Sequence, residues 1–156
     1  MYRRIMIVVD DQPASRVAIE EGTSLAARHG AEAVYLALLP AYPVSVAGDM
    51  AIGAVAPAEF RQSALANADE LLSDAMSAAL RAGVVARRTH GPEGGDARCI
   101  VEAARRRQCD LIVVGSAGGN AVMRLLNGSL VPGLITASQM PVLVCKKTGA
   151  ARRTVH

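Results

Sequence analysis

The sequence predicts an α/β protein whose doubly wound, five-stranded parallel sheet has the strand order 3-2-1-4-5 and carries helices on both faces. Short runs of apolar, often β-branched residues recur along the chain, as in strands that are covered on both faces. Longer segments with helical periodicity separate these runs. Connections of that length between strands favour right-handed crossovers, and therefore a parallel sheet.

The predicted strands are short and apolar. The first, at residues 5–9, reads Ile-Met-Ile-Val-Val. The others are expected at residues 33–39, 84–89, 110–114 and 141–147. Uninterrupted apolar runs of this kind are typical of strands in the middle of an α/β sheet.

Helices are expected between the strands, at residues 14–28, 58–82, 96–107 and 129–138. Residues 40–57 form a long connection that is either a surface insertion or a lid. Five strands together with a long second helix favour the strand order 3-2-1-4-5. In this order the direction of winding reverses between strands one and four. Ligands of such folds bind in the crevice at the carboxyl ends of those strands.

The chain of 156 residues fits one domain, which we place at residues 1–147, followed by a short basic tail at 148–156 that we expect to be disordered. A composition of 51% hydrophobic and 20% charged residues suits a compact globular protein. The cysteines, Cys99, Cys109 and Cys145, are odd in number and widely spaced. We expect them to be reduced and buried, and we expect no metal site.

The first nine residues hold two arginines and a short apolar run that reaches an acid at Asp10. This run is too short for a signal peptide or a membrane helix, so we expect a cytoplasmic protein without a membrane partner. The formal net charge is +3, the basic pairs are scattered along the sequence, and tryptophan is absent. We therefore expect no nucleic-acid partner.

A glycine-rich segment follows the fourth predicted strand. Gly115, Gly118 and the pair Gly128-Ser129 have the spacing Gly-x2-Gly-x9-Gly-Ser. Glycines at a strand end let backbone N–H groups approach an anion, and amides after a helix cap can face a phosphate. Taken alone, the first half can also be a tight turn and the second a plain N-cap.

Other nucleotide and catalytic motifs are missing from the sequence. It contains no GxxxxGK[ST], no GxGxxG and no GxSxG, and none of its histidines has an evident nucleophile to activate. Asp10 and Asp11 are adjacent, so we expect one to face a ligand and the other to begin a helix, rather than a metal-binding pair. We assign no catalytic residue.

The glycine spacing, together with Val8-Val9-Asp10, the run from Asp110 to Gly115 and the closing Pro141-Val142-Leu143-Val144, resembles the universal stress protein family over nearly the whole chain. Within that family it is similar to the nucleotide-binding branch. The resemblance implies an adenine nucleotide alpha-hydrolase-like fold that binds ATP with Mg²⁺. It also implies a homodimer joined through the last strand, from Pro141 to Cys145.

The resemblance also assigns roles to individual residues. Asp10 matches the acid that contacts adenosine, with Val8 and Leu39 lining the base pocket. Gly115 would lie close to the ribose. The phosphates would be held by Gly118, Gly128, Ser129 and the amide of Leu130. This division is physically reasonable, because a carboxylate accepts hydrogen bonds from ribose hydroxyls while amides suit the anionic end.

The leading functional hypothesis is an ATP-binding regulatory protein of the stress response that acts as a nucleotide-dependent switch. Rapid phosphoryl transfer needs a positioned base and a cation clamp, and Arg124 is the only Lys or Arg that accompanies the glycine motif. We therefore expect slow hydrolysis at most, and not an enzyme. Two alternatives stay open: a hydrolase or adenylate-transferring enzyme acting on adenine nucleotides, and a dimeric scaffold that uses no nucleotide.

Overall fold

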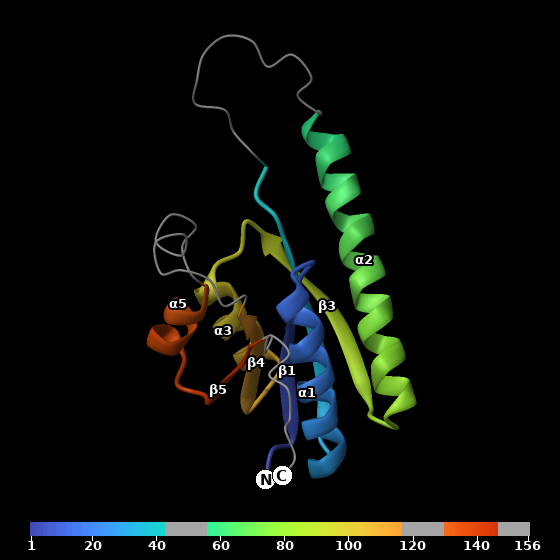
Figure 1. Ribbon diagram of the computed structural model, residues 1–156. Coiled ribbons are helices and arrows are strands. Elements are labelled where there is room, and N and C mark those ends of the chain that lie inside the picture. The colour runs from blue at the N-terminus through green and yellow to red at the C-terminus, as the bar shows by residue number, and fades with distance from the viewer. Residues whose placement is uncertain (43–55, 117–129, 147–156) are drawn as a thin grey trace, which may run out of the picture.

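Five parallel strands form the central sheet of the computed structural model, which describes residues 1–42, 56–116 and 130–146 (Figure 1). Their order is β3-β2-β1-β4-β5, as the sequence predicts, and every neighbouring pair is parallel. The strands are β1 Arg4–Val9, β2 Glu32–Leu39, β3 Ala86–Glu93, β4 Leu111–Ser116 and β5 Val142–Lys146. Because β1 lies at the centre, the direction of winding reverses between β1 and β4.

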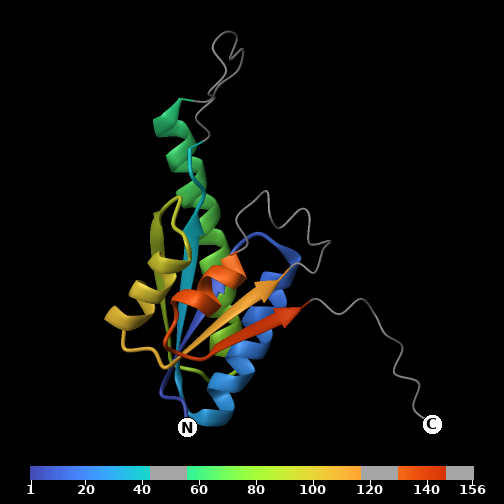
Figure 2. The same ribbon diagram turned by 90° about the vertical axis from the view of Figure 1, so that its left-hand side faces the viewer.

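Helices cover both faces of the sheet (Figures 1 and 2). The described helices are α1 Pro13–His29, α2 Pro57–Arg81, α3 Ala97–Arg106 and α5 Leu130–Ala137. One buried cluster joins the sheet to α1 and α2, and a second joins its other face to α3 and α5. The layered α/β architecture predicted from the sequence is thus confirmed.

The central strand shows how the sequence specifies these two layers. Ile5, Ile7 and Val9 belong to the cluster under α1 and α2, whereas Met6 and Val8 belong to the cluster under α3 and α5. All five side chains are buried because successive residues of a strand point to opposite faces. Burial of each contributes about 1.5–3 kcal/mol, so an uninterrupted apolar run is what this position requires.

Helix ends follow their expected chemistry. Helix α1 begins at Pro13 and ends at Gly30, which adopts the left-handed conformation with φ 62°. The carboxylate of Asp96 caps α3, accepting hydrogen bonds from the N–H groups of Arg98 at 3.0 Å and Cys99 at 3.1 Å. These bonds, chiefly that from Cys99, lower the pKa of Asp96.

The third strand differs from its predicted position. The sequence predicts it at residues 84–89, but it begins at Ala86 and extends to Glu93. A turn follows, where the Gly95 N–H donates to the Pro92 carbonyl at 3.1 Å. Because β3 is the outer strand, a proline near its end is tolerated there.

The three cysteines are free thiols, as predicted. Cys109 and Cys145 are buried, and burial raises the pKa of both, that of Cys109 to about 11. Cys99 is only half-buried, so the prediction that all three are buried is wrong for that residue. It lies on α3 and is not among the buried residues of that helix.

Some predictions fall outside the described residues. They concern most of the 40–57 connection, Gly118, Arg124, Gly128, Ser129 and the tail at 148–156. Across the described ranges, no helix is both long and apolar enough to cross a membrane.

Candidate functional site

The segment after β1 and the end of β4 meet at the carboxyl edge of the sheet. Residue 115 has no room for a side chain, since a Cβ there would lie 2.5 Å from both the carbonyl carbon and oxygen of Ala14. Ala14 belongs to the first turn of α1. The end of β4 is therefore packed against the start of α1, at the position where the strand order predicts a crevice.

Asp10 is held in the connection between β1 and α1 by two hydrogen bonds. Its N–H donates to Oγ of Ser15 at 3.0 Å, and its Oδ1 accepts from the N–H of Gln12 at 2.9 Å. Burial raises the pKa of Asp10; the bond from Gln12 opposes this effect and the nearby charge of Asp11 adds to it. The site thus contains a fixed carboxylate whose charge is only partly compensated, which is a common property of binding groups.

A cavity of about 350 Å³ lies beside Asp10, which is within the size range of small-molecule sites. Its walls come from the connections after β1, β2 and β3 and from one side of α2. The lining residues are Asp10, Asp11, Leu38, Leu39, Pro40, Ala41, Ala64, Asn67, Ala68, Leu71, Gly94 and Gly95. The cavity therefore has carboxylates on one wall and mainly apolar side chains on the others.

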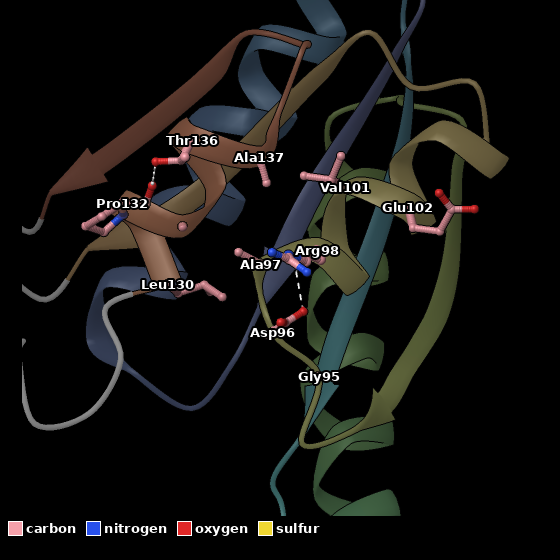
Figure 3. Close-up of a pocket in the computed structure, with 11 residues that line it drawn as sticks. Gly95, Asp96, Ala97, Arg98, Val101, Glu102, Leu130, Pro132, Thr136 and Ala137 are labelled. Atoms are coloured by element: carbon pink, nitrogen blue, oxygen red, sulfur yellow. Dashed lines mark hydrogen bonds between the residues drawn. The ribbon is translucent and has the colours of Figure 1, made fainter.

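A larger groove of about 940 Å³ runs between α3 and α5 (Figure 3). Leu130 and Pro132 line it from α5, and Ala97, Arg98 and Val101 from α3. Gly95 lines both this groove and the Asp10 cavity, so the two spaces adjoin at the connection between β3 and α3. Arg98 is the one cationic side chain among the described residues that line either space.

The structure brings several of the predicted site residues to this edge. Asp10 and Leu39 line the same cavity, Leu130 begins α5 and lines the adjoining groove, and Gly115 lies against α1. Gly118, Gly128 and Ser129 lie outside the described residues, so their phosphate contacts stay predictions.

Val8 and Leu39, which are expected to line the base pocket together, do not lie on the same face of the sheet. Val8 is buried in the cluster under α3 and α5, while Leu39 belongs to the cluster under α1 and α2. The two side chains therefore lie on opposite faces of the sheet. The Asp10 cavity is lined by Leu39 and not by Val8.

Sequence reasoning missed the contribution of α2 to the cavity. Asn67, Ala68 and Leu71 reach it from the middle of that helix, and no local motif distinguishes them from other residues of an amphipathic helix. Gly94 and Gly95 were also missed, although a glycine pair between a strand and a helix was a visible signal.

The sequence model of the universal stress protein family matches residues 1–146. The chain belongs to the universal stress protein family. It is similar to the universal stress protein MJ0531 of Methanocaldococcus jannaschii, with 30% identity over 148 residues that cover 94% of this chain and 84% of the relative. The resemblance stated from the sequence is thereby confirmed at the level of the family.

Solved structures of other universal stress proteins share the fold. One from Archaeoglobus fulgidus, in complex with dAMP, has a TM-score of 0.65 and 20% identity, covering 93% of this chain and 98% of its own. One from Arabidopsis thaliana, with AMP bound, has a TM-score of 0.67 and 18% identity, and the match covers 94% of this chain and 93% of that one. At these identities the similarity shows the fold alone.

Proposed function

We propose that this universal stress protein binds ATP at the carboxyl edge of its sheet and acts as a nucleotide-dependent switch in the stress response. The observation that carries the proposal is the cavity that is lined both by Asp10 and by the apolar residues Leu39, Ala68 and Leu71. An acid beside an apolar wall suits adenosine, whose ribose hydroxyls donate hydrogen bonds and whose base is flat and largely apolar.

The adjoining groove indicates where the phosphates would lie. From the Asp10 cavity the space continues past Gly95 to Leu130, at the start of α5. The positive end of the helix dipole favours an anion there, away from the carboxylates of Asp10 and Asp11. The proposal therefore places adenosine beside Asp10 and the triphosphate toward α5.

Mg²⁺ fits this arrangement as a companion of the nucleotide. Within the described parts of the chain, no group of three or more His, Cys, Asp or Glu side chains is gathered to hold a metal ion. Mg²⁺ commonly binds through substrate phosphates and water rather than through a protein cage. In the proposal, the phosphates supply its main ligands.

Two structural relatives support an adenine nucleotide as the ligand, since one was solved with dAMP and the other with AMP. We extend this to ATP and to slow turnover, because the described lining of the two spaces offers a single guanidinium, that of Arg98, and fast phosphoryl transfer needs a cation clamp. Rapid, saturable hydrolysis of ATP would instead favour the alternative of a hydrolase or an adenylate-transferring enzyme.

Calorimetric titration with ATP, ADP and AMP tests the proposal. We expect ATP to bind the native chain and Asp10→Ala to weaken binding by roughly tenfold or more, the effect of losing a hydrogen-bonded charged group. Asp74→Ala, an exposed acid on the same helix that lines the cavity, is the matched control and should bind as the native chain does. Absence of heat with all three nucleotides would favour the scaffold without nucleotide.

We also propose a two-fold dimer through β5. This strand is the outer one on its side of the sheet, and Leu143 on it is 39% exposed while Val142 and Val144 are half-buried. An apolar outer strand with unpaired backbone groups favours pairing with a second copy.

A further inference from the structure

A further groove of about 490 Å³ lies between α3 and the end of β3. Strand β3 lies at the edge of the sheet opposite β5, and α3 lies beside it (Figure 2). Its lining comes from three residues of the strand and one side of the helix. They are His90, Gly91, Pro92, Arg98, Cys99, Glu102, Ala103, Arg106 and Arg107. None of the proposed adenosine contacts is among them.

The groove carries positive charge. Arg98, Arg106 and Arg107, from α3 and its end, line it, and Arg107 donates to Oγ1 of Thr89 on β3 at 2.6 Å. Residues 86–107 hold six arginines and three acids, a difference of +3 that equals the formal net charge of the whole chain.

Within the described part of the chain, Arg98 and Arg107 form no ion pair, whereas Arg87, Arg105 and Arg106 do. Glu102, the one carboxylate that lines the groove, already pairs with Arg106 at 2.9 Å and lies 3.8 Å from Arg105. The guanidinium of Arg107 donates only to neutral oxygens, those of Ala103 and Thr89. An anionic ligand would thus meet cations that have few competing partners.

The floor of the groove is small and uncharged. Gly91 and Pro92 on the strand and Cys99 and Ala103 on the helix line it, so a polypeptide backbone can approach closely beside the cations of α3. Aromatic side chains, on which nucleic-acid bases stack, do not line it apart from the imidazole of His90. This lining suits an extended peptide better than a nucleic-acid strand.

The two outer strands of the sheet also differ in chemistry. The apolar residues of β5 favour a second copy of the chain, whereas Arg87 and Arg88 on β3 repel one. From these observations we propose that the groove between α3 and β3 binds an extended acidic segment of a partner protein, whose carboxylates pair with Arg98, Arg106 and Arg107. No residue that lines the Asp10 cavity lines this groove, whereas Arg98 and Glu102 also line the groove proposed for the triphosphate.

Fluorescence anisotropy with a labelled peptide tests this proposal. The probe is an alternating glutamate-threonine peptide of about ten residues, which spans roughly 33 Å when extended. Its glutamine-threonine counterpart is the neutral control. We expect the acidic peptide to bind in low salt, and to bind more weakly as salt is raised, while the neutral peptide does not bind.

Charge-neutralised variants locate the binding. Arg106→Gln/Arg107→Gln should weaken binding by about fivefold or more, as expected for the loss of two partly exposed ion pairs. Arg28→Gln/Arg81→Gln removes the same charge from the last turns of α1 and α2 and should bind as the native chain does. The single variant Arg106→Gln, at an exposed position, gives the same test if the double variant is less stable.

Three results would overturn the proposal. The first is equal binding of the acidic and neutral peptides, and the second is an equal loss of binding in the groove variant and the matched control. The third is displacement of the acidic peptide by a short oligothymidylate at a lower concentration than by unlabelled peptide, which would assign the groove to nucleic acid.

Discussion

Gly115 lies so close to Ala14 that a Cβ at residue 115 would come within 2.5 Å of the Ala14 carbonyl group. This contact joins the end of β4 to the first turn of α1, and so fixes the distance between the two chain segments that border the candidate site. The glycine is required by backbone packing, whatever its further contact with a ligand.

Gly115→Ala should therefore destabilise the protein. The neighbouring atoms belong to the backbone and cannot move aside as a flexible side chain would, so we expect a loss of about 1–3 kcal/mol in the free energy of unfolding. Urea unfolding followed by circular dichroism measures this quantity. A variant as stable as the native chain would show that the end of β4 and the first turn of α1 can move apart without loss in the free energy of unfolding.

A buried polar pair offers a second test of the packing. The hydroxyls of Thr23 on α1 and Tyr35 on β2 lie 2.7 Å apart, and both residues are buried. Burial also raises the pKa of Tyr35, with the bond to Thr23 acting in the opposite direction. Tyr35→Phe leaves the Thr23 hydroxyl without this partner and should cost about 1–3 kcal/mol.

The double variant Thr23→Val/Tyr35→Phe separates the hydrogen bond from the packing. Because it removes both polar groups, it should recover part of the stability lost in Tyr35→Phe. Additive losses from the two substitutions in urea unfolding would mean that the hydroxyls do not interact.

The order of elements was predictable because most strands are covered on both faces and so read as uninterrupted apolar runs. The outer strand β3 breaks this rule. It reads Ala-Arg-Arg-Thr-His-Gly-Pro-Glu, and its glycine and proline indicate a turn when the sequence is taken alone. Its pairing with β2, which continues to Glu93 opposite Leu39, is a tertiary effect that local signals do not contain.

The site was predictable to a smaller extent. Asp10 and Leu39, which the family resemblance assigns to the site, line one cavity at the carboxyl ends of the strands. Val8 lies on the other face of the sheet because side chains alternate along a strand, and its contact with the base stays a prediction. The wall formed by Ala68 and Leu71 depends on how far α2 extends over the sheet, which no motif records.

The charged form of Asp10 should lower the free energy of unfolding at neutral pH. Burial raises its pKa in the folded protein above the ordinary value of 3.8, so the folded state binds more protons than the unfolded state just above that pH. Stability contributed by the protonated form is therefore lost as the pH rises through this window. Asp10→Asn should melt at a higher temperature than the native chain at pH 7, with a smaller difference near pH 4.

Thermal unfolding at a series of pH values checks this prediction. The control Asp74→Asn, at an exposed position of α2, should show no such dependence. A native chain that is more stable than Asp10→Asn at pH 7 would mean that the hydrogen bond from Gln12 outweighs the cost of burial.

The proposed dimer predicts that Leu143→Lys gives a monomer. A charge in the centre of an outer strand opposes pairing with a second copy, because two like charges would face each other. Light scattering at micromolar concentration should give about twice the chain mass of 16.2 kDa for the native protein and the chain mass for the variant. Ile135→Lys, which changes a 63% exposed apolar residue on α5, is the matched control and should stay dimeric.

Hydrogen exchange with and without ATP tests the central claim most directly, since it reports the position of the ligand. The account predicts slower exchange in the turn around Asp10 and at the start of α5, with no change at the end of α3, around Arg106 and Arg107. Protection confined to other parts of the molecule, or none at ATP concentrations that saturate binding, would contradict it.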